Sequence, residues 1–242
     1  MTDALRLTSF HPAMRAAVIG GGGIGAAVCA ALRASPDVCE VISLSRRDDA
    51  DVHLDVSDEG SIRVAADKIK AGGKLDLVFV ATGMLQDEKT SPEKALSSLT
   101  ADAMAQLFAV NAIGPAMVAK HFLPLLAKGR KSAFTALSAR VGSIGDNRLG
   151  GWHSYRTSKA ALNMLIRTMS VELRRRNPDA LIVGLHPGTV ATPLSAQFQK
   201  GVVEGKLFTP DGSARAMITV LDSLSTDDSG GHFAWDGVRI PD

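Results

Sequence analysis

The stretch AAVIGGGGIGAAVCAALRA, residues 16–34, passes from an apolar run through four consecutive glycines into a run with helical character. Residues 16–20 (AAVIG) are apolar and end in glycine, which is typical of a short buried strand. Residues 26–34 (AAVCAALRA) predict a helix that ends at Ser35-Pro36, because a residue before proline avoids the α conformation. The order strand, glycine turn, helix predicts the opening unit of an α/β fold.

The glycine turn also has a spacing that matters for binding. Gly20, Gly22 and Gly25 satisfy the pattern G-x-G-x-x-G between the expected strand and helix. Glycine permits a tight turn and a close approach of backbone to a pyrophosphate, whose charge is stabilised at the helix N-terminus. A flexible turn is the alternative, but the flanking strand and helix favour a dinucleotide site that includes Gly23 and Ile24.

Strand and helix patterns alternate along the rest of the chain, with short connections. Further strands are expected at 41–44, 75–82, 132–138, 181–188 and 231–237, and further helices at 61–71, 100–127, 154–176 and 211–224. The pattern predicts an α/β fold with a single-domain doubly wound parallel sheet (Rossmann-like) and helices on both faces. We expect one domain over residues 1–242, with residues 1–13 as a flexible N-terminal extension.

Composition excludes several classes of function. The 242 residues are 45% hydrophobic and 21% charged, with a net charge of +2, so nucleic acid is not an expected partner. We see no apolar run of the ~18 residues that a membrane span needs, and no secretory signal. Cys29, Cys39 and six scattered histidines have no metal-site spacing. We therefore expect a cytoplasmic protein without metal.

The residues after the second expected strand indicate which dinucleotide binds. An Asp or Glu usually stands about 20 residues beyond the glycine turn when the cofactor lacks a 2′-phosphate. Here Ser45, Arg46 and Arg47 occupy that place. Guanidinium groups hold a phosphate through charge-assisted hydrogen bonds, so NADP(H) is favoured over NAD(H). Asp48 and Asp49 leave NAD(H) possible, because a shift of one residue brings a carboxylate into the site.

The only tyrosine of the chain, Tyr155, lies four residues before Lys159 at the start of an expected helix. Residues four apart lie on the same helix face, so the two side chains should point into the same space. A phenol has a pKa near ~10, and a nearby positive charge favours its anion. The pair is either a tuned proton donor or an ordinary surface tyrosine beside a solvated lysine.

Together these features resemble the short-chain dehydrogenases/reductases. The resemblance covers nearly the whole chain and adds the motifs LDVS (54–57), ATG (81–83), VNAIGP (110–115), YRTSK (155–159) and HPGTVATP (186–193). The segments SARVGSIGDNRLGGW (138–152) and GGHFAWDGVRIP (230–241) are most similar to the C-factor-like carbonyl reductases.

The resemblance implies a role for each matching residue. Tyr155 would donate a proton to a carbonyl, while Lys159 would bind the nicotinamide ribose and lower the pKa of the tyrosine. Asn111, in a helix interrupted by NAIGP, would hold a proton-relay water. The cofactor would further contact Asp55 and Val56 at the adenine, Ala81, Thr82 and Gly83 at the adenosine ribose, and Pro187, Gly188, Val190 and Thr192 at the nicotinamide.

The chain departs from the family pattern at two places. The glycine turn is one residue short, since Gly20 lies three residues before Gly23 where the family has four. The catalytic serine of the family precedes a glycine as S-x-x-G, but counting back from Gly142 leads to Ala139. Ser138 or Ser143 would then polarise the carbonyl; a bulge would be needed to re-aim Ser138, which we slightly favour.

The resulting hypothesis is an NADPH-dependent oxidoreductase that transfers a hydride to the carbonyl of an aldehyde, ketone or quinone. The substrate is a small-molecule carbonyl or alcohol, and residues 193–208 should cover its pocket. The alternative is a C-factor-like signalling or sensor protein that binds a nucleotide with little turnover. The family resemblance also implies a homodimer or homotetramer.

Overall fold

The computed structural model describes residues 5–87, 90–193, 195–196 and 207–242. Seven strands in this part of the chain form one sheet, in the order β3-β2-β1-β4-β5-β6-β9, and all neighbouring pairs are parallel. The predicted doubly wound parallel sheet is confirmed. The strands are β1 (Met14–Ile19), β2 (Val38–Ser45), β3 (Val52–His53), β4 (Leu77–Val80), β5 (Ser132–Leu137), β6 (Ala180–His186) and β9 (His232–Ala234).

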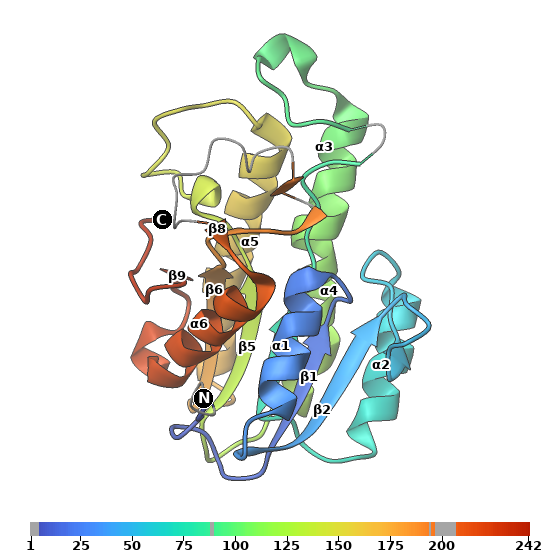
Figure 1. The fold of residues 1–242 in the computed structure, drawn as a ribbon, viewed down its shortest axis with the longest axis vertical. Coiled ribbons are helices and arrows are strands. Elements are labelled where there is room, and N and C mark those ends of the chain that lie inside the picture. The colour runs from blue at the N-terminus through green and yellow to red at the C-terminus, as the bar shows by residue number, and fades with distance from the viewer. Residues whose placement is uncertain (1–4, 88–89, 194, 197–206) are drawn as a thin grey trace.

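Helices cover both faces of the sheet (Figure 1). On one face, α1 (Gly23–Arg33) and α6 (Pro210–Ser223) pack against side chains such as Val18 and Phe79. On the other face, α2 (Glu59–Lys70), α4 (Gly114–Phe122) and α5 (His153–Arg174) pack against side chains such as Phe134. The strand interiors are apolar on both sides because both sides are covered.

The strand order places a crevice at the carboxyl ends of the strands. The chain runs outward from β1 to β2 and β3, then returns to place β4 on the other side of β1. In open α/β sheets the ligand binds outside the carboxyl ends of the strands at such a reversal. The glycine turn, which follows β1, and the ATG motif, which follows β4, both lie there.

The helix expected at 100–127 is interrupted. It consists of α3 (Ala101–Phe108), a π-helical segment (Ala109–Ile113), α4 and a 3₁₀ turn (Leu123–Leu125). By length and composition the whole stretch, Ala101–Leu125, is apolar enough to cross a membrane. However, Leu107, Val118 and Phe122 are at most 2% exposed, and Val118 and Phe122 pack in the core under the sheet. Part of this apolar stretch therefore lies in the core, and 33% of its most apolar window is buried.

The expectation of a flexible segment at residues 1–13 is wrong for residues 5–13. Leu7 and Phe10 are 1% and 5% exposed, because they pack into the same core layer as α1 and α6. Asp37 accepts hydrogen bonds from Arg6 and from the Leu7 amide, at 2.8–2.9 Å. Apolar side chains in a polar N-terminal run were too few to show this packing in the sequence.

Sequence patterns also missed the shortest elements. Strand β3 and the two-stranded parallel sheet of β7 (Thr189–Val190) and β8 (Leu207–Phe208) have two residues each, too few to show a period. The segment 193–208, expected to cover the substrate pocket, lies largely outside the described residues. Short 3₁₀ turns occupy Leu96–Ser98, Arg140–Gly142 and Thr226–Asp228.

Candidate active site

The glycine turn is tight because it folds back on itself. Gly20 has a φ of 125°, and a Cβ built on it would lie 3.0 Å from the Ala81 backbone. A Cβ built on Gly25 would collide with the carbonyl oxygen of Gly20. Gly22, by contrast, faces open space and caps the N-terminus of α1. The turn therefore needs glycine at 20 and 25 to close, while Gly22 leaves room for a ligand at the helix N-terminus.

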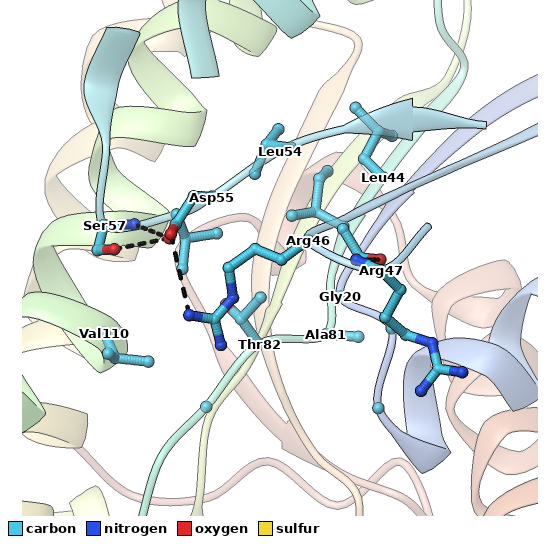
Figure 2. A pocket seen from close by; sticks show the side chains of 16 residues that line it. Gly20, Leu44, Arg46, Arg47, Leu54, Asp55, Ser57, Ala81, Thr82 and Val110 are labelled. Atoms are coloured by element: carbon cyan, nitrogen blue, oxygen red, sulfur yellow. Dashed lines mark hydrogen bonds and ion pairs between the residues drawn. The ribbon is translucent and has the colours of Figure 1, made fainter. Parts of the chain in front are cut away.

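A cavity of about 360 Å³, here called the arginine cavity, opens beside this turn (Figure 2). Its walls come from the carboxyl ends of β1, β2 and β4 and from the segment after β3. The lining residues that the sequence predicted are Gly20, Gly22, Ser45, Arg46, Arg47, Asp55, Val56, Ala81, Thr82 and Gly83. Sequence reasoning assigned no site role to Ile19, Gly21, Leu44, Leu54, Ser57 and Val110, although Gly21, Leu54, Ser57 and Val110 lie inside quoted motifs.

The two arginines point to different sides of the arginine cavity (Figure 2). Arg46 lies 3.8 Å from the carboxylate of Asp55, and Arg47 donates hydrogen bonds of 3.0 and 3.2 Å to Asp49. Both arginine side chains are largely exposed, at 74% and 63%. Hydrogen bonds from Ser57 hold the pKa of Asp55 below its usual range, so this carboxylate is ionised.

The arginine cavity fits a phosphorylated adenosine. Leu44, Leu54 and Val110 offer apolar walls, and the hydroxyl of Thr82 is buried without a hydrogen-bond partner among the described residues. Arg46 and Arg47 bring two cations to the wall. Asp48 and Asp49 are not among the described residues of this wall, but Asp49 lines the adjoining cavity and accepts hydrogen bonds from Arg47.

A second cavity of about 390 Å³, here called the tyrosine cavity, contains Tyr155. The predicted residues Ile24, Ser138, Pro187, Gly188, Val190 and Thr192 also line it. Sequence reasoning assigned no site role to Leu85, Arg140, Val141, Trp152, His186, Thr189 and Ser195, which complete its wall with Ala139. These residues come from the loops after β4 and β5, the start of α5, the end of β6 and the segment from β7 onward, which only the fold brings together.

Tyr155, Lys159 and Asn111 converge where the two cavities approach each other. The ammonium of Lys159 lies 5.9 Å from the Tyr155 ring centre, which confirms that the two side chains share a helix face. A Cβ built on Gly83, in the wall of the arginine cavity, would lie 3.5 Å from Lys159 Nζ and 3.7 Å from Asn111 Oδ1. The lysine also donates a 2.8 Å hydrogen bond to the Leu137 carbonyl.

Asn111 lies in the π-helical segment and is fully buried. Its Oδ1 accepts from the Met84 amide, and its Nδ2 donates to the Met84 carbonyl, both at 2.8 Å. Nδ2 also donates to Ser158 Oγ at 3.0 Å. The side chain thereby ties the ATG turn to α5, and π-bulges of this kind are frequent at functional sites.

Burial sets the protonation of the tyrosine–lysine pair. It raises the pKa of Tyr155 to about 12 and lowers the pKa of Lys159 to about 7. The expected lowering of the tyrosine pKa by the lysine is therefore not found, because desolvation raises this pKa. Tyr155 holds its proton at neutral pH, as a proton donor must.

The start of α5 is fixed by a residue that the sequence did not suggest. Trp152, at the N-cap, has a φ of 51° and provides no side-chain cap. Instead, the carboxylate of Glu93 accepts hydrogen bonds from the amide and the hydroxyl of Ser154, and the Glu93 carbonyl accepts from the Trp152 amide at 2.6 Å. A carboxylate at a helix N-terminus is stabilising, so Glu93 holds Tyr155 in place.

Neither serine that was expected to replace Ala139 is well placed for that role. Ser143 is not among the described residues of the tyrosine cavity, and its Oγ accepts a 3.0 Å hydrogen bond from the Asp146 amide. Ser138 does line the cavity, but its hydroxyl donates a 2.6 Å hydrogen bond to Asn163 Oδ1. No bulge re-aims Ser138, since its amide continues the ladder to Leu185 at 2.8 Å.

A dinucleotide-type cavity next to a tyrosine–lysine pair, in which the lysine is buried, defines a Rossmann-like oxidoreductase. The sequence model of the family described as enoyl-(acyl carrier protein) reductase matches residues 23–217. The chain belongs to the short-chain dehydrogenase/reductase family of enzymes.

Several curated relatives and solved structures are similar to this chain. The C-signal protein of Myxococcus xanthus is 40% identical over 57% of this chain and 78% of its own. The 1-hydroxy-2-glutathionyl-2-methyl-3-butene dehydrogenase of a Rhodococcus species is 34% identical over 73% of both chains. The NADPH-bound carbonyl reductase from chicken fatty liver is 28% identical, with a TM-score of 0.81 over 96% of this chain and 95% of that one.

Proposed function

We propose that the protein reduces the carbonyl group of a small aldehyde, ketone or quinone with NADPH, and that Tyr155 donates the proton. One observation carries the proposal. Tyr155 is protonated by virtue of its raised pKa and lines a cavity of about 390 Å³, while Lys159 beside it reaches toward the wall of the arginine cavity. A proton donor and a cofactor cavity thus meet at one edge of the sheet.

The residues present fit NADP(H) better than NAD(H). Arg46 and Arg47 line the arginine cavity, and guanidinium groups bind a 2′-phosphate with charge-assisted hydrogen bonds. The 28% identical carbonyl reductase from chicken liver, described as NADPH-bound, supports this choice. When bound, the cofactor supplies the hydride.

The chain supplies orientation and the proton. Lys159 would hold the nicotinamide ribose, and Pro187, Gly188, Val190 and Thr192 would flank the nicotinamide. Tyr155 then gives its phenolic proton to the carbonyl oxygen as charge develops there, which is general acid catalysis. Asn111 Oδ1 has a second lone pair beyond its bond to Met84, and this lone pair is available to a relay water.

The test is a panel of aldehydes, ketones and quinones assayed with NADPH and with NADH. We expect turnover with NADPH, and a loss of about 10²–10⁴-fold in Tyr155→Phe with the dissociation constant of NADPH nearly unchanged. Lys159→Ala should impair both turnover and NADPH binding. A Tyr155→Phe variant with wild-type rates would refute Tyr155 as the donor.

The similarity to the C-signal protein favours a second candidate, a nucleotide-binding signalling protein with little turnover. Ala139, which has no hydroxyl, is consistent with it. Tight NADPH binding without turnover of any carbonyl in the panel would support this alternative over the reductase. The homodimer or homotetramer and the cytoplasmic location remain predictions.

A further inference from the structure

The proposed reaction leaves the carbonyl oxygen with only one identified hydrogen-bond donor. Negative charge develops on this oxygen as the hydride adds, and a second positioned donor typically contributes about 10²–10³ in rate. Ala139 forms the wall of the tyrosine cavity and is 8% exposed, but its methyl group cannot donate. The proton of Ser138 is held by Asn163.

Most other polar side chains in this wall also have partners. Arg140 pairs with Asp146 at 3.0 Å, and Trp152, Thr192 and Ser195 each have interactions within the protein. Apart from Tyr155 itself, the remaining polar side chains among the described lining residues are His186 and Thr189.

His186 lies beside the place that the missing serine hydroxyl would serve. It is the last residue of β6, whose register with β5 pairs Leu185 with Leu137. The next step of that parallel register sets His186 next to Ser138, one residue before Ala139. Side chains at paired positions of neighbouring strands lie on the same face of the sheet. His186 and Ser138 therefore share a face, and both line the tyrosine cavity together with Ala139, so the imidazole reaches this cavity from the strand beside β5.

The imidazole of His186 has hydrogen-bonding capacity that the protein does not use. Its Nδ1 is buried and has no partner within the described part of the chain. Nε2 makes no hydrogen bond within the described residues and is not among the buried unpartnered atoms, so it remains accessible on a ring that lines the cavity. In the tautomer with the proton on Nε2, the buried Nδ1 is only an acceptor without a partner, and the N–H donor of Nε2 is available to the cavity.

The surroundings keep this ring neutral. Burial, assisted by the positive charge of Arg140 and opposed by Asp236, lowers the pKa of His186 to about 4. A neutral imidazole still carries one N–H group and can donate a hydrogen bond to a carbonyl oxygen without giving up its proton.

We propose that His186 donates a hydrogen bond from Nε2 to the carbonyl oxygen of the substrate and so replaces the serine hydroxyl that Ala139 lacks. This proposal rests on the proposed reductase function. The carbon–oxygen π bond breaks as the hydride joins the carbon, the oxygen takes the proton of Tyr155, and the proton of His186 stays on Nε2. His186 is thus a catalytic residue that stabilises charge and transfers nothing.

Four variants test the proposal on a carbonyl compound that the wild-type enzyme reduces. His186→Leu should lower kcat about 100-fold while the dissociation constant of NADPH stays within about twofold. His186→Gln, which keeps an N–H donor at a similar reach, should lose at most about tenfold. Introducing Ala139→Ser into His186→Leu should restore at least about tenfold, because it returns a hydroxyl to the wall. Thr189→Val tests the other polar side chain of this wall and should lower kcat far less than His186→Leu does.

The outcomes separate this proposal from the one on which it rests. Turnover that requires Tyr155 but is unchanged in His186→Leu overturns the role of His186 alone. A loss of kcat in His186→Leu that Ala139→Ser does not relieve, while NADPH still binds, also overturns this role. A loss of kcat in Thr189→Val that is larger than the loss in His186→Leu does the same. A wild-type protein that reduces no carbonyl overturns both proposals.

Discussion

The guanidinium of Arg46 lies 3.8 Å from the carboxylate of Asp55, and both side chains line the arginine cavity (Figure 2). Arg46 is 74% exposed, so this ion pair is weak and its guanidinium can turn to a stronger anion. Arg47 is held in the same way by Asp49, whose carboxylate lies outside the wall. Both arginine side chains at this edge are thus exposed rather than buried in ion pairs, and their guanidinium groups can bind a phosphate.

Arg46→Ala and Arg47→Ala should therefore weaken NADPH binding much more than NADH binding. Each lost charge-assisted hydrogen bond costs about 1.5–3 kcal/mol, which corresponds to roughly 10- to 100-fold in affinity. Fluorescence titration of both cofactors measures the preference. Arg63→Ala, an exposed arginine of α2, is the control and should change neither affinity. Equal affinity of the wild type for NADPH and NADH would contradict the assignment.

Replacing either serine near Ala139 should affect stability more than turnover. Ser138→Ala leaves Asn163 Oδ1 without its donor, which costs about 1–3 kcal/mol of unfolding free energy, and Ser143→Ala removes the acceptor of the Asp146 amide. We expect kcat to stay within about threefold, because an effect of 10²-fold needs a donor on the reacting oxygen. Urea unfolding measures the unfolding free energy, and steady-state kinetics measure kcat. A 100-fold fall in kcat for a folded Ser138→Ala would return the catalytic role to that serine.

The buried ammonium of Lys159 should make the stability of the cofactor-free protein depend on pH. The folded protein loses this proton near pH 7, whereas the unfolded chain keeps it until pH ~10.4. The unfolded state binds more protons in between, so Lys159 causes stability to rise between pH 7 and pH 10. Lys159→Met should remove this increment, while Lys68→Met, at an exposed position of α2, should preserve it. Melting temperatures measured between pH 7 and pH 10 test this prediction. An unaltered slope of stability against pH in Lys159→Met would show that the lysine is not desolvated.

The N-terminal segment should contribute to the core. Leu7→Ala removes a side chain that is 1% exposed and should lower the unfolding free energy by about 2–5 kcal/mol. Leu96→Ala, at a position 70% exposed, is the control and should change it by less than about 0.5 kcal/mol. Chemical denaturation of both variants tests this. Equal stability of the two would restore the view of a loosely attached extension.

The alternation of elements and the first cavity were predictable because they depend on neighbours in the chain. Glycine spacing after an apolar strand predicts a tight turn, and apolar runs of four to eight residues predict buried strands. Arg46 and Arg47 directly follow such a strand, so their place at its carboxyl end followed from its boundary. The pairing of Tyr155 with Lys159 followed from the helical period alone.

Local spacing in the sequence could not show whether Ser138 or Ser143 is free to polarise the carbonyl. Ser138 and Ser143 both carry the required hydroxyl, but their availability depends on Asn163 and Asp146 as hydrogen-bond partners. Glu93 is a similar case, since it caps a helix that begins about 60 residues later in the chain and no motif marks it. Such partners are chosen by packing between distant segments.

By itself the sequence determined the doubly wound sheet, the glycine turn, the arginines at its edge and the tyrosine–lysine pair, because periodicity and spacing act over a few residues. Only the tertiary structure decided that Tyr155 keeps its proton, that Ser138 is engaged by Asn163 and that His186 faces the tyrosine cavity. Burial and strand register decide these properties, and both arise from contacts between residues that lie far apart in the chain.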